Sequence, residues 1–92
     1  MKKYRVLVRG ENLLLAFEEG PRRMGFYTTR FVEAAGPEEA ESAIVESLRQ
    51  DGELGALVLN QPDDTPLMYV EEIEEVGSLR DASGFSFYPY EA

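Results

Sequence analysis

The chain contains no histidine and no cysteine. Histidine is the side chain best suited to exchange a proton near neutral pH, and cysteine supplies thiolate nucleophiles, disulfides and ligands for structural zinc. Carboxylates, hydroxyls, tyrosine, lysine and arginine are therefore the groups left for chemistry. These absences disfavour an enzyme, and they predict that the chain has no catalytic residue, no metal site and no cofactor.

Long hydrophobic runs are also missing. The longest uninterrupted apolar run covers residues 13–17, whereas a helix needs about 20 such residues to cross a bilayer. The basic start, residues 1–5, is not followed by the apolar stretch of a secretory signal. Together with the lack of disulfides, this predicts a cytoplasmic protein with no membrane partner.

Basic residues are few compared with acidic ones: nine Lys and Arg against eighteen Asp and Glu, which gives a net charge of −9. Residues 1–30 hold seven basic and three acidic side chains, whereas residues 31–92 hold two and fifteen. This acidic excess excludes nucleic acid as an expected partner. The uneven split predicts basic strands beside acidic strands in one sheet, or a dipolar surface that orients a protein partner.

Three strands are expected before the first helix, at residues 4–9, 13–17 and 26–34, because these segments alternate or are rich in apolar, β-branched and aromatic residues. Gly10, Glu11 and Asn12 form a connection of hairpin length, since glycine and asparagine readily adopt positive φ. Residues 18–23 form a charged loop that contains Gly-Pro. Together these segments predict an antiparallel meander.

An amphipathic helix is expected to begin at Pro37 and to end near Arg49. Gly36 is an acceptable N-cap, proline suits the first helical position, and acidic residues fill the first turn. One apolar stripe follows at helical spacing: Ala40, Ala43, Ile44 and Leu48.

Beyond the helix, strands are expected at residues 56–59, 67–76 and 85–87, with a β-bulge between Val70 and Ile73. The spacing of three between Val70, Ile73 and Val76 also suits a helical turn, which stays open as an alternative for that segment. The expected fold is a single α+β domain, residues 1–92. It is an antiparallel sheet of about five strands in the order β-β-β-α-β-β, with an extra C-terminal strand as an option, covered on one face by a single helix. One helix cannot cover so wide a sheet, so part of it should be open to solvent, to a second copy or to a partner.

The aromatic tail, residues 84–90, is the leading candidate for recognition. Tyr88 and Tyr90 combine contact area with a hydroxyl group, whereas Phe85 and Phe87 are expected to complete the core. A second candidate set would hold an anionic small ligand through guanidinium groups: Arg22, Arg23 and Arg30, beside Tyr27.

Other patterns point to ordinary surface. Arg22-Arg23 before Gly25-Phe26-Tyr27 is similar to the basic and aromatic pattern of sheets that bind single-stranded RNA, but the net charge opposes that function. Asp63-Asp64 predicts a solvated turn rather than a calcium loop. The four glutamates of residues 71–75 predict a charged edge strand.

Four segments resemble a group of small bacterial proteins of unknown function: residues 25–34, 37–40, 70–76 and 84–89. This resemblance spans nearly the whole chain and implies no activity. Residues 4–50 are also similar to HicB-type antitoxins, in which a three-stranded meander leads into a helix through a Pro/Thr-Glu-Glu-Ala segment, here residues 37–40. The glycine-rich strand end and the DNA-binding segment of that family are missing. The likeness implies inhibition of a basic protein.

The sequence therefore favours a small acidic, non-catalytic module that associates with itself as a homodimer or with a protein partner, through a sheet edge or the aromatic tail. One alternative is an anionic-ligand binder or enzyme that uses Arg22, Arg23 and Arg30. The other is an antitoxin-like inhibitor of a basic protein.

Overall fold

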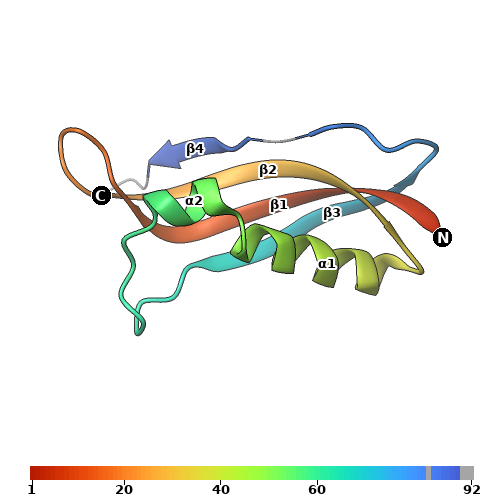
Figure 1. The fold of residues 1–92 in the computed structure, drawn as a ribbon, viewed down its shortest axis with the longest axis horizontal. Helices are drawn as coiled ribbons and strands as arrows, with labels where there is room; N and C mark the ends of the chain where they lie inside the picture. Colours follow the sequence, from red (N-terminus) through yellow and green to blue (C-terminus); the bar gives the residue numbers. More distant parts are fainter. Residues whose placement is uncertain (83, 90–92) are drawn as a thin grey trace.

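A computed structural model describes residues 1–82 and 84–89 of the chain. Its elements, in chain order, are β1 (Lys2–Leu15), β2 (Arg22–Ala34), α1 (Pro37–Arg49), α2 (Gly52–Leu57), β3 (Leu67–Val76) and β4 (Ser86–Pro89) (Figure 1). The strands form one antiparallel sheet in the order β3-β1-β2-β4. The expected α+β fold with an antiparallel sheet is confirmed, but the sheet has four described strands instead of about five.

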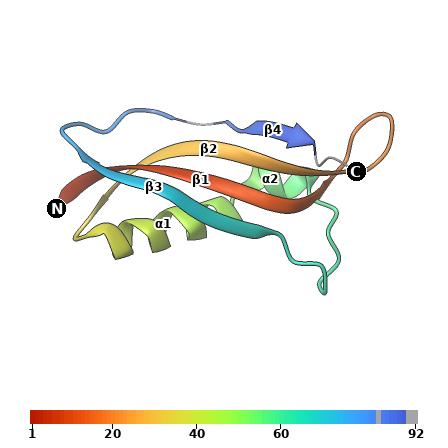
Figure 2. The ribbon, with the colours of Figure 1, turned by 180° about the vertical axis from the view of Figure 1, so that it is seen from behind.

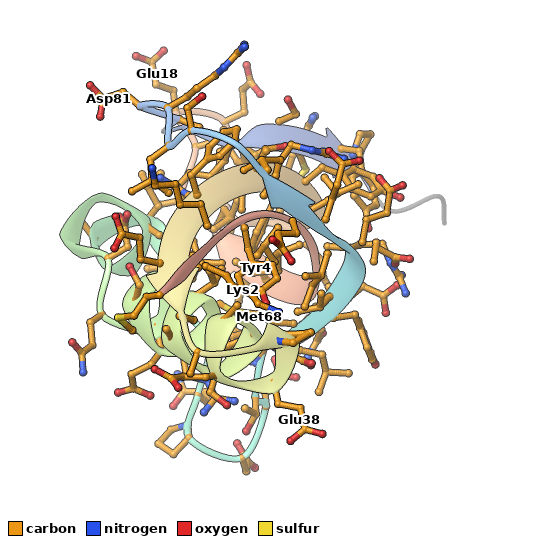
Figure 3. The ribbon with its side chains drawn as sticks, turned by 90° about the vertical axis from the view of Figure 1, so that its right-hand side faces the viewer. Lys2, Tyr4, Glu18, Glu38, Met68 and Asp81 are labelled. Atoms are coloured by element: carbon orange, nitrogen blue, oxygen red, sulfur yellow. The ribbon has the colours of Figure 1, made fainter. Side chains whose placement is uncertain are left out.

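Both helices lie on the same face of the sheet, as the two opposite views show (Figures 1 and 2). The strands are long and strongly twisted, so that in a view along the molecule they wrap around a common centre (Figure 3). Tyr4 lies inside this curved sheet, whereas Glu18, Glu38 and Asp81 point outward. Neither α1 nor α2 is long and apolar enough to cross a membrane.

Two hydrophobic clusters fill the space between the helices and the sheet. The first packs Tyr4, Val6 and Val8 of β1 against the buried stripe of α1. That stripe consists of Ala40, Ile44 and Leu48, while Ala43 is exposed. The second cluster packs residues of β1 and β2 against Leu54 of α2: Leu13, Leu15, Met24 and Phe26. The prediction of an amphipathic helix at residues 37–49 is therefore confirmed.

The expected turn at residues 10–12 is wrong, because β1 continues through it as one strand. Between Gly10 and Leu13 the register against β2 shifts by one residue, which is a β-bulge. Asn12 adopts a φ of 61° in this bulge. The residue types that build hairpin turns here kink a strand instead, so the predicted three-stranded meander is a two-stranded hairpin.

The expected strand at residues 56–59 is also wrong. Residues 52–57 form α2, whose N-cap Asp51 accepts a hydrogen bond from the Leu54 amide at 2.9 Å. Extended backbone begins only at Val58, which forms a single β-bridge with Leu15. The side chain of Asp51 accepts from an amide of the first helical turn that would otherwise have no partner. A short apolar segment that suits a strand or a helix therefore becomes a helix here.

The C-terminal strands agree more closely with expectation. β3 spans the predicted residues 67–76, and its register against β1 shifts between Leu7 and Val8, opposite Glu72 and Val70. The expected bulge between Val70 and Ile73 is therefore confirmed. β4 pairs with β2 at the predicted C-terminal position.

Candidate binding surface

The face of the sheet opposite the helices carries the candidate site. Side chains alternate along a strand, so the buried Val6 and Val8 of β1 face the helices while Leu7 and Arg9 face the other way. No described helix covers this second face, which we call the open face. Residues of the other strands are assigned to it through their pairing with β1.

Three side chains form a row across the open face. Arg9 of β1 pairs in register with Tyr27 of β2 on one side and with Tyr69 of β3 on the other. The guanidinium carbon of Arg9 lies 4.8 Å from the centroid of the Tyr69 ring, a cation–π contact. Tyr27, on the inner strand β2, is 43% exposed, and Tyr69, on the edge strand β3, is 41% exposed. The fold therefore places one exposed tyrosine ring on each side of the Arg9 side chain.

Tyr88 of β4 extends this row because glycine leaves room for its ring. It pairs with Gly25, where a Cβ atom would overlap the tyrosine ring. The Tyr88 hydroxyl donates a hydrogen bond to the Gly10 carbonyl oxygen at 3.3 Å. Its ring centroid lies 5.5 Å from that of Tyr27. Two of the expected site residues, Tyr27 and Tyr88, are therefore neighbours.

Ion pairs hold the positive charges of β1 against the acidic strand β3. Arg9 pairs with Glu71 and with Glu11, and Arg5 lies 3.7 Å from Glu74 and 3.9 Å from Glu72. The hydrogen bond to Glu71 raises the pKa of Arg9 above its ordinary value. The prediction that basic strands lie beside acidic ones is confirmed for β1 and β3. These contacts fix the orientation of Arg9 between the two tyrosines.

Beside Tyr27 the open face is hollowed. A shallow depression of about 270 Å³ lies between β1, β2 and the segment that leads into β4. Its floor and walls are small or apolar: Leu7, Thr28, Thr29, Ala82, Gly84, Phe85 and Ser86. The depression lies next to the tyrosine row.

The structure does not bring Arg22, Arg23 and Arg30 together. All three lie on β2, and at about 3.3 Å per residue the backbone of Arg22 is roughly 26 Å from that of Arg30. Arg22 pairs with Glu19 at 3.9 Å, on the loop that precedes β2. Each of the other two arginines has a separate structural contact.

Arg23 joins a polar network at one end of the sheet. Its guanidinium lies 3.0 Å from the Asp64 carboxylate and also donates to Asn12. The Asn12 amide donates to Asp64 at 2.9 Å, and this hydrogen bond, together with Arg23, lowers the pKa of Asp64 below its ordinary value. Asn60 donates to the backbone carbonyl oxygens of Asn12 and Asp64, both at 2.8 Å. The turn that contains Asp64 is therefore tied to the bulge of β1.

Arg30 holds the segment between β3 and β4 against β2. It donates to the carbonyl oxygen of Ala82 at 3.2 Å, and its guanidinium lies 5.1 Å from the centroid of the Phe85 ring. Its Nε atom is buried with no hydrogen-bond partner among the described residues. Phe85 packs against both hydrophobic clusters, whereas Phe87 is 36% exposed. Tyr90, the remaining candidate, lies outside the described residues.

Sequence reasoning missed Arg9 and Tyr69. Strand alternation alone would have placed Arg9 on the face of β1 opposite the buried valines. Their contact depends on the register between β1 and β3, which are about sixty residues apart in the chain. In the part of the chain that the structure describes, no three acidic side chains are grouped so that they could hold a metal ion.

Comparisons of the chain with protein-family models, with curated proteins and with solved structures found no match.

Proposed function

We propose that the chain is a non-catalytic, cytoplasmic module that binds a protein partner through the open face of its sheet. The observation that carries this proposal is the row of Tyr69, Arg9 and Tyr27, in which both tyrosines are exposed and Arg9 is half-buried between them. Tyrosine and arginine are enriched among the residues that dominate protein interfaces. Tyrosine also supplies large contact area at a small cost in conformational entropy.

The rigidity of the row supports the proposal. Arg9 is held by two carboxylates and by the Tyr69 ring, and Tyr27 lies against Tyr88. A partner therefore meets side chains that are already ordered, so less entropy is lost on binding. The depression beside Tyr27 adds a site for an anchoring side chain.

The charge of the chain favours a basic partner over a second copy. A net charge of −9 makes two copies repel each other, whereas it attracts a basic protein and orients its approach. The four glutamates of β3 also oppose pairing between two β3 edges, because central antiparallel registers put glutamate opposite glutamate. We therefore propose a basic protein partner rather than a homodimer.

An affinity capture experiment with surface variants tests this proposal. Tagged wild-type chain, a Tyr27→Ser/Tyr69→Ser variant and a Phe17→Ser control are incubated with native lysate and washed at low and then high salt. Phe17 is a matched control because it is aromatic, 42% exposed and outside the strands. We expect one basic protein on the wild type and the control, released by salt, and at least tenfold less on the double variant.

The proposal is overturned if the double variant retains the same partner as the wild type. A concentration-dependent dimer in light scattering that Tyr27→Ser dissociates would replace the basic partner with a second copy. An inhibitor of the antitoxin type is a special case of the same proposal, with a single basic toxin as the partner. The acidic surface and the helix that begins at Pro37 agree with that likeness.

A joint anion site at Arg22, Arg23 and Arg30 is the weaker alternative, because these residues are far apart along β2 and each has a structural contact. A thermal-shift screen with anionic metabolites tests it. Stabilisation that is lost in Arg30→Gln but kept in Arg22→Gln would favour a site at Arg30 alone.

A further inference from the structure

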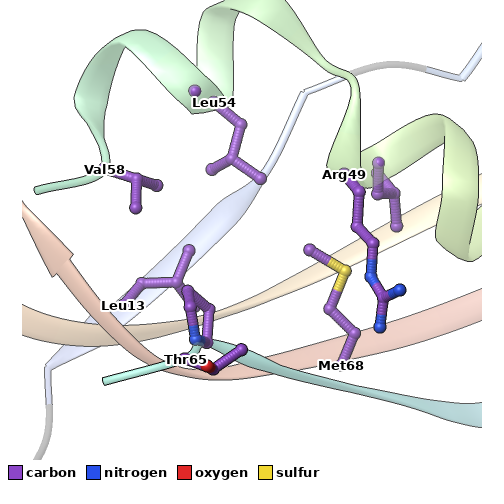
Figure 4. A pocket seen from close by; sticks show the side chains of 9 residues that line it. Leu13, Arg49, Leu54, Val58, Thr65 and Met68 are labelled. Atoms are coloured by element: carbon purple, nitrogen blue, oxygen red, sulfur yellow. The ribbon is translucent and has the colours of Figure 1, made fainter. Parts of the chain in front are cut away.

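A half-open cavity of about 270 Å³ lies on the helix side of the sheet, away from the tyrosine row. It is bounded by the end of α1, by α2 and by strands β1 and β3. Figure 4 shows Leu13, Leu54 and Val58 on one side of the cavity, Met68 and Arg49 on the other, and Thr65 at its edge. The remaining lining residues are Leu48, Gly55 and Pro66.

The cavity lies where the two hydrophobic clusters meet. Leu48 belongs to the cluster under α1, Leu13 and Leu54 belong to the cluster under α2, and Met68 packs against both. Leu13, Leu48 and Leu54 are at most 4% exposed, so the core fixes the walls in place. The cavity is therefore an apolar gap between two packed regions.

Its size suits a short hydrocarbon chain. A dry apolar cavity of about 150 Å³ accommodates benzene, so by the same scale a volume of about 270 Å³ holds roughly ten carbon-sized atoms. Because the cavity is half-open, one end of a bound chain reaches the solvent. That end must match the polar groups at the mouth.

Arg49 is the single charged residue of the lining. Its side chain runs alongside Met68 (Figure 4). Among the described side chains Arg49 forms no ion pair or hydrogen bond, and the Glu46 carboxylate accepts a hydrogen bond from the Gln50 side chain at 2.7 Å. A guanidinium group matches the geometry of a carboxylate and binds it through two parallel hydrogen bonds. An apolar cavity with one arginine in its lining therefore suits an apolar molecule with one carboxylate.

We infer that this cavity binds an unbranched aliphatic carboxylate of about eight carbons, with the hydrocarbon chain between Leu13, Leu54 and Met68 and the carboxylate at Arg49. The cavity and the open face lie on opposite sides of the sheet. This inference is therefore independent of the proposed protein partner, and either can fail without the other.

Isothermal titration calorimetry with defined probes tests the inference. Octanoate, octanol and octylamine are titrated below their aggregation concentrations, followed by hexanoate and decanoate. We expect one octanoate per chain, and about fourfold weaker binding for each methylene removed. Decanoate should gain little over octanoate, because the cavity is then full. Octanol should bind at least tenfold more weakly, and octylamine more weakly still.

Two arginine variants separate direct recognition from general charge. Arg49→Gln should reduce octanoate affinity at least tenfold, to the level of octanol, and leave octanol binding unchanged. Arg80→Gln is the matched control, because Arg80 is exposed, outside the cavity and equally charged. It should bind octanoate like the wild type.

Three results would overturn the inference. The first is no heat of binding for octanoate at low millimolar concentration. The second is equal affinity for octanoate and octylamine, or a stoichiometry well above one, because either indicates surfactant-like binding to the surface. The third is an equal loss of octanoate binding in Arg49→Gln and Arg80→Gln.

Discussion

Substituting Gly10 tests the packing on which both faces of the sheet depend. The residue is buried in β1, and a Cβ atom built on it would overlap the ring of its cross-strand partner Phe26. Phe26 has no exposed surface and lies at the centre of an aromatic group. Its ring contacts Phe85 edge-on at 5.0 Å and Phe87 at 6.4 Å between centroids. Gly10→Ala must therefore displace a fully buried ring.

Three contributions set the size of the effect. Overpacking a well-filled core costs about 1–3 kcal/mol, and each disturbed aromatic pair contributes about 0.5–1.5 kcal/mol. Replacing glycine by alanine within a strand gives back about 0.5–1 kcal/mol of chain entropy. The net loss of unfolding free energy for Gly10→Ala is therefore about 3 kcal/mol, which corresponds to a fall in Tm of roughly 12–24 °C for a domain of this size.

Thermal and urea unfolding, followed by circular dichroism, measure this loss. Gly77→Ala is the control, because a Cβ atom at Gly77 meets nothing within 4 Å and the residue lies just beyond β3. It should unfold within about 0.5 kcal/mol of the wild type. A Gly10→Ala variant that melts within 2 °C of the wild type would refute the contact between Gly10 and Phe26 and, with it, the register of β1 on β2.

Three further predictions concern other parts of the fold. Gly25→Ala should displace the Tyr88 ring on the open face. We expect a loss of unfolding free energy of only about 1 kcal/mol but a clear loss of partner capture. Equal capture by this variant and by the wild type would contradict the proposed surface. Gly55→Ala in α2 should raise the unfolding free energy by about 0.5–1 kcal/mol, because a Cβ atom built at this position meets no other atom within 4 Å and alanine favours a helix. A decrease in unfolding free energy, measured by urea unfolding, would argue against a helix there. The hydrogen bond from Asn12 lowers the pKa of Asp64 below the ordinary value of 3.8. In the folded state Asp64 therefore binds a proton less readily than in the unfolded chain, so its contribution to stability is present above about pH 4 and is lost as the pH falls through the folded pKa. In urea titrations, the difference in unfolding free energy between the wild type and Asp64→Asn should shrink as the pH falls from 5 to 2. A difference that stays constant over this range would exclude a link between Asp64 protonation and stability.

The elements that sequence reasoning predicted correctly carry several local signals that agree. α1 has proline at its start, acidic residues in its first turn and a buried apolar stripe. β3 has a proline-rich turn before it, a glycine after it and an alternation that slips at its bulge. For α1 no competing structure has a supporting signal nearby. For β3 the spacing of Val70, Ile73 and Val76 also suits a helical turn, and the strand is favoured because several other local signals agree.

The two wrong elements share a different property. The Gly10–Asn12 segment satisfies the requirements of a hairpin turn and of a strand bulge equally well. The choice depends on the Phe26 ring, which needs the space above Gly10. Residues 56–59 suit a strand or the end of a helix, and the cap provided by Asp51 decides. These deciding contacts involve residues outside the segment, so a pattern within the segment cannot reveal them.

The candidate site shows the same contrast between features set by local sequence and features set by distant contacts. Tyr27 and Tyr88 could be named as site candidates from residue type, because tyrosine combines a large contact area with a hydroxyl group. Their contact with each other, and the row with Arg9 and Tyr69, required the strand order β3-β1-β2-β4. Residue types were thus predictable, whereas their grouping was set by pairing between distant strands.

Gly10 and Gly25 explain how one hairpin supports both the core and the open face. They lie close together on β1 and β2 but face opposite sides of the sheet, and each leaves space for an aromatic ring from the neighbouring strand. The ring above Gly10 is Phe26, which closes the core. The ring above Gly25 is Tyr88, whose hydroxyl reaches across β2 to the Gly10 carbonyl oxygen. Because the backbone of Gly10 contacts both rings, a shift of β1 that relieves an alanine at Gly10 must also move Tyr88. A substitution designed to disturb the core at Gly10 should therefore weaken partner capture as well, whereas one at Gly25 should weaken capture with little effect on the core.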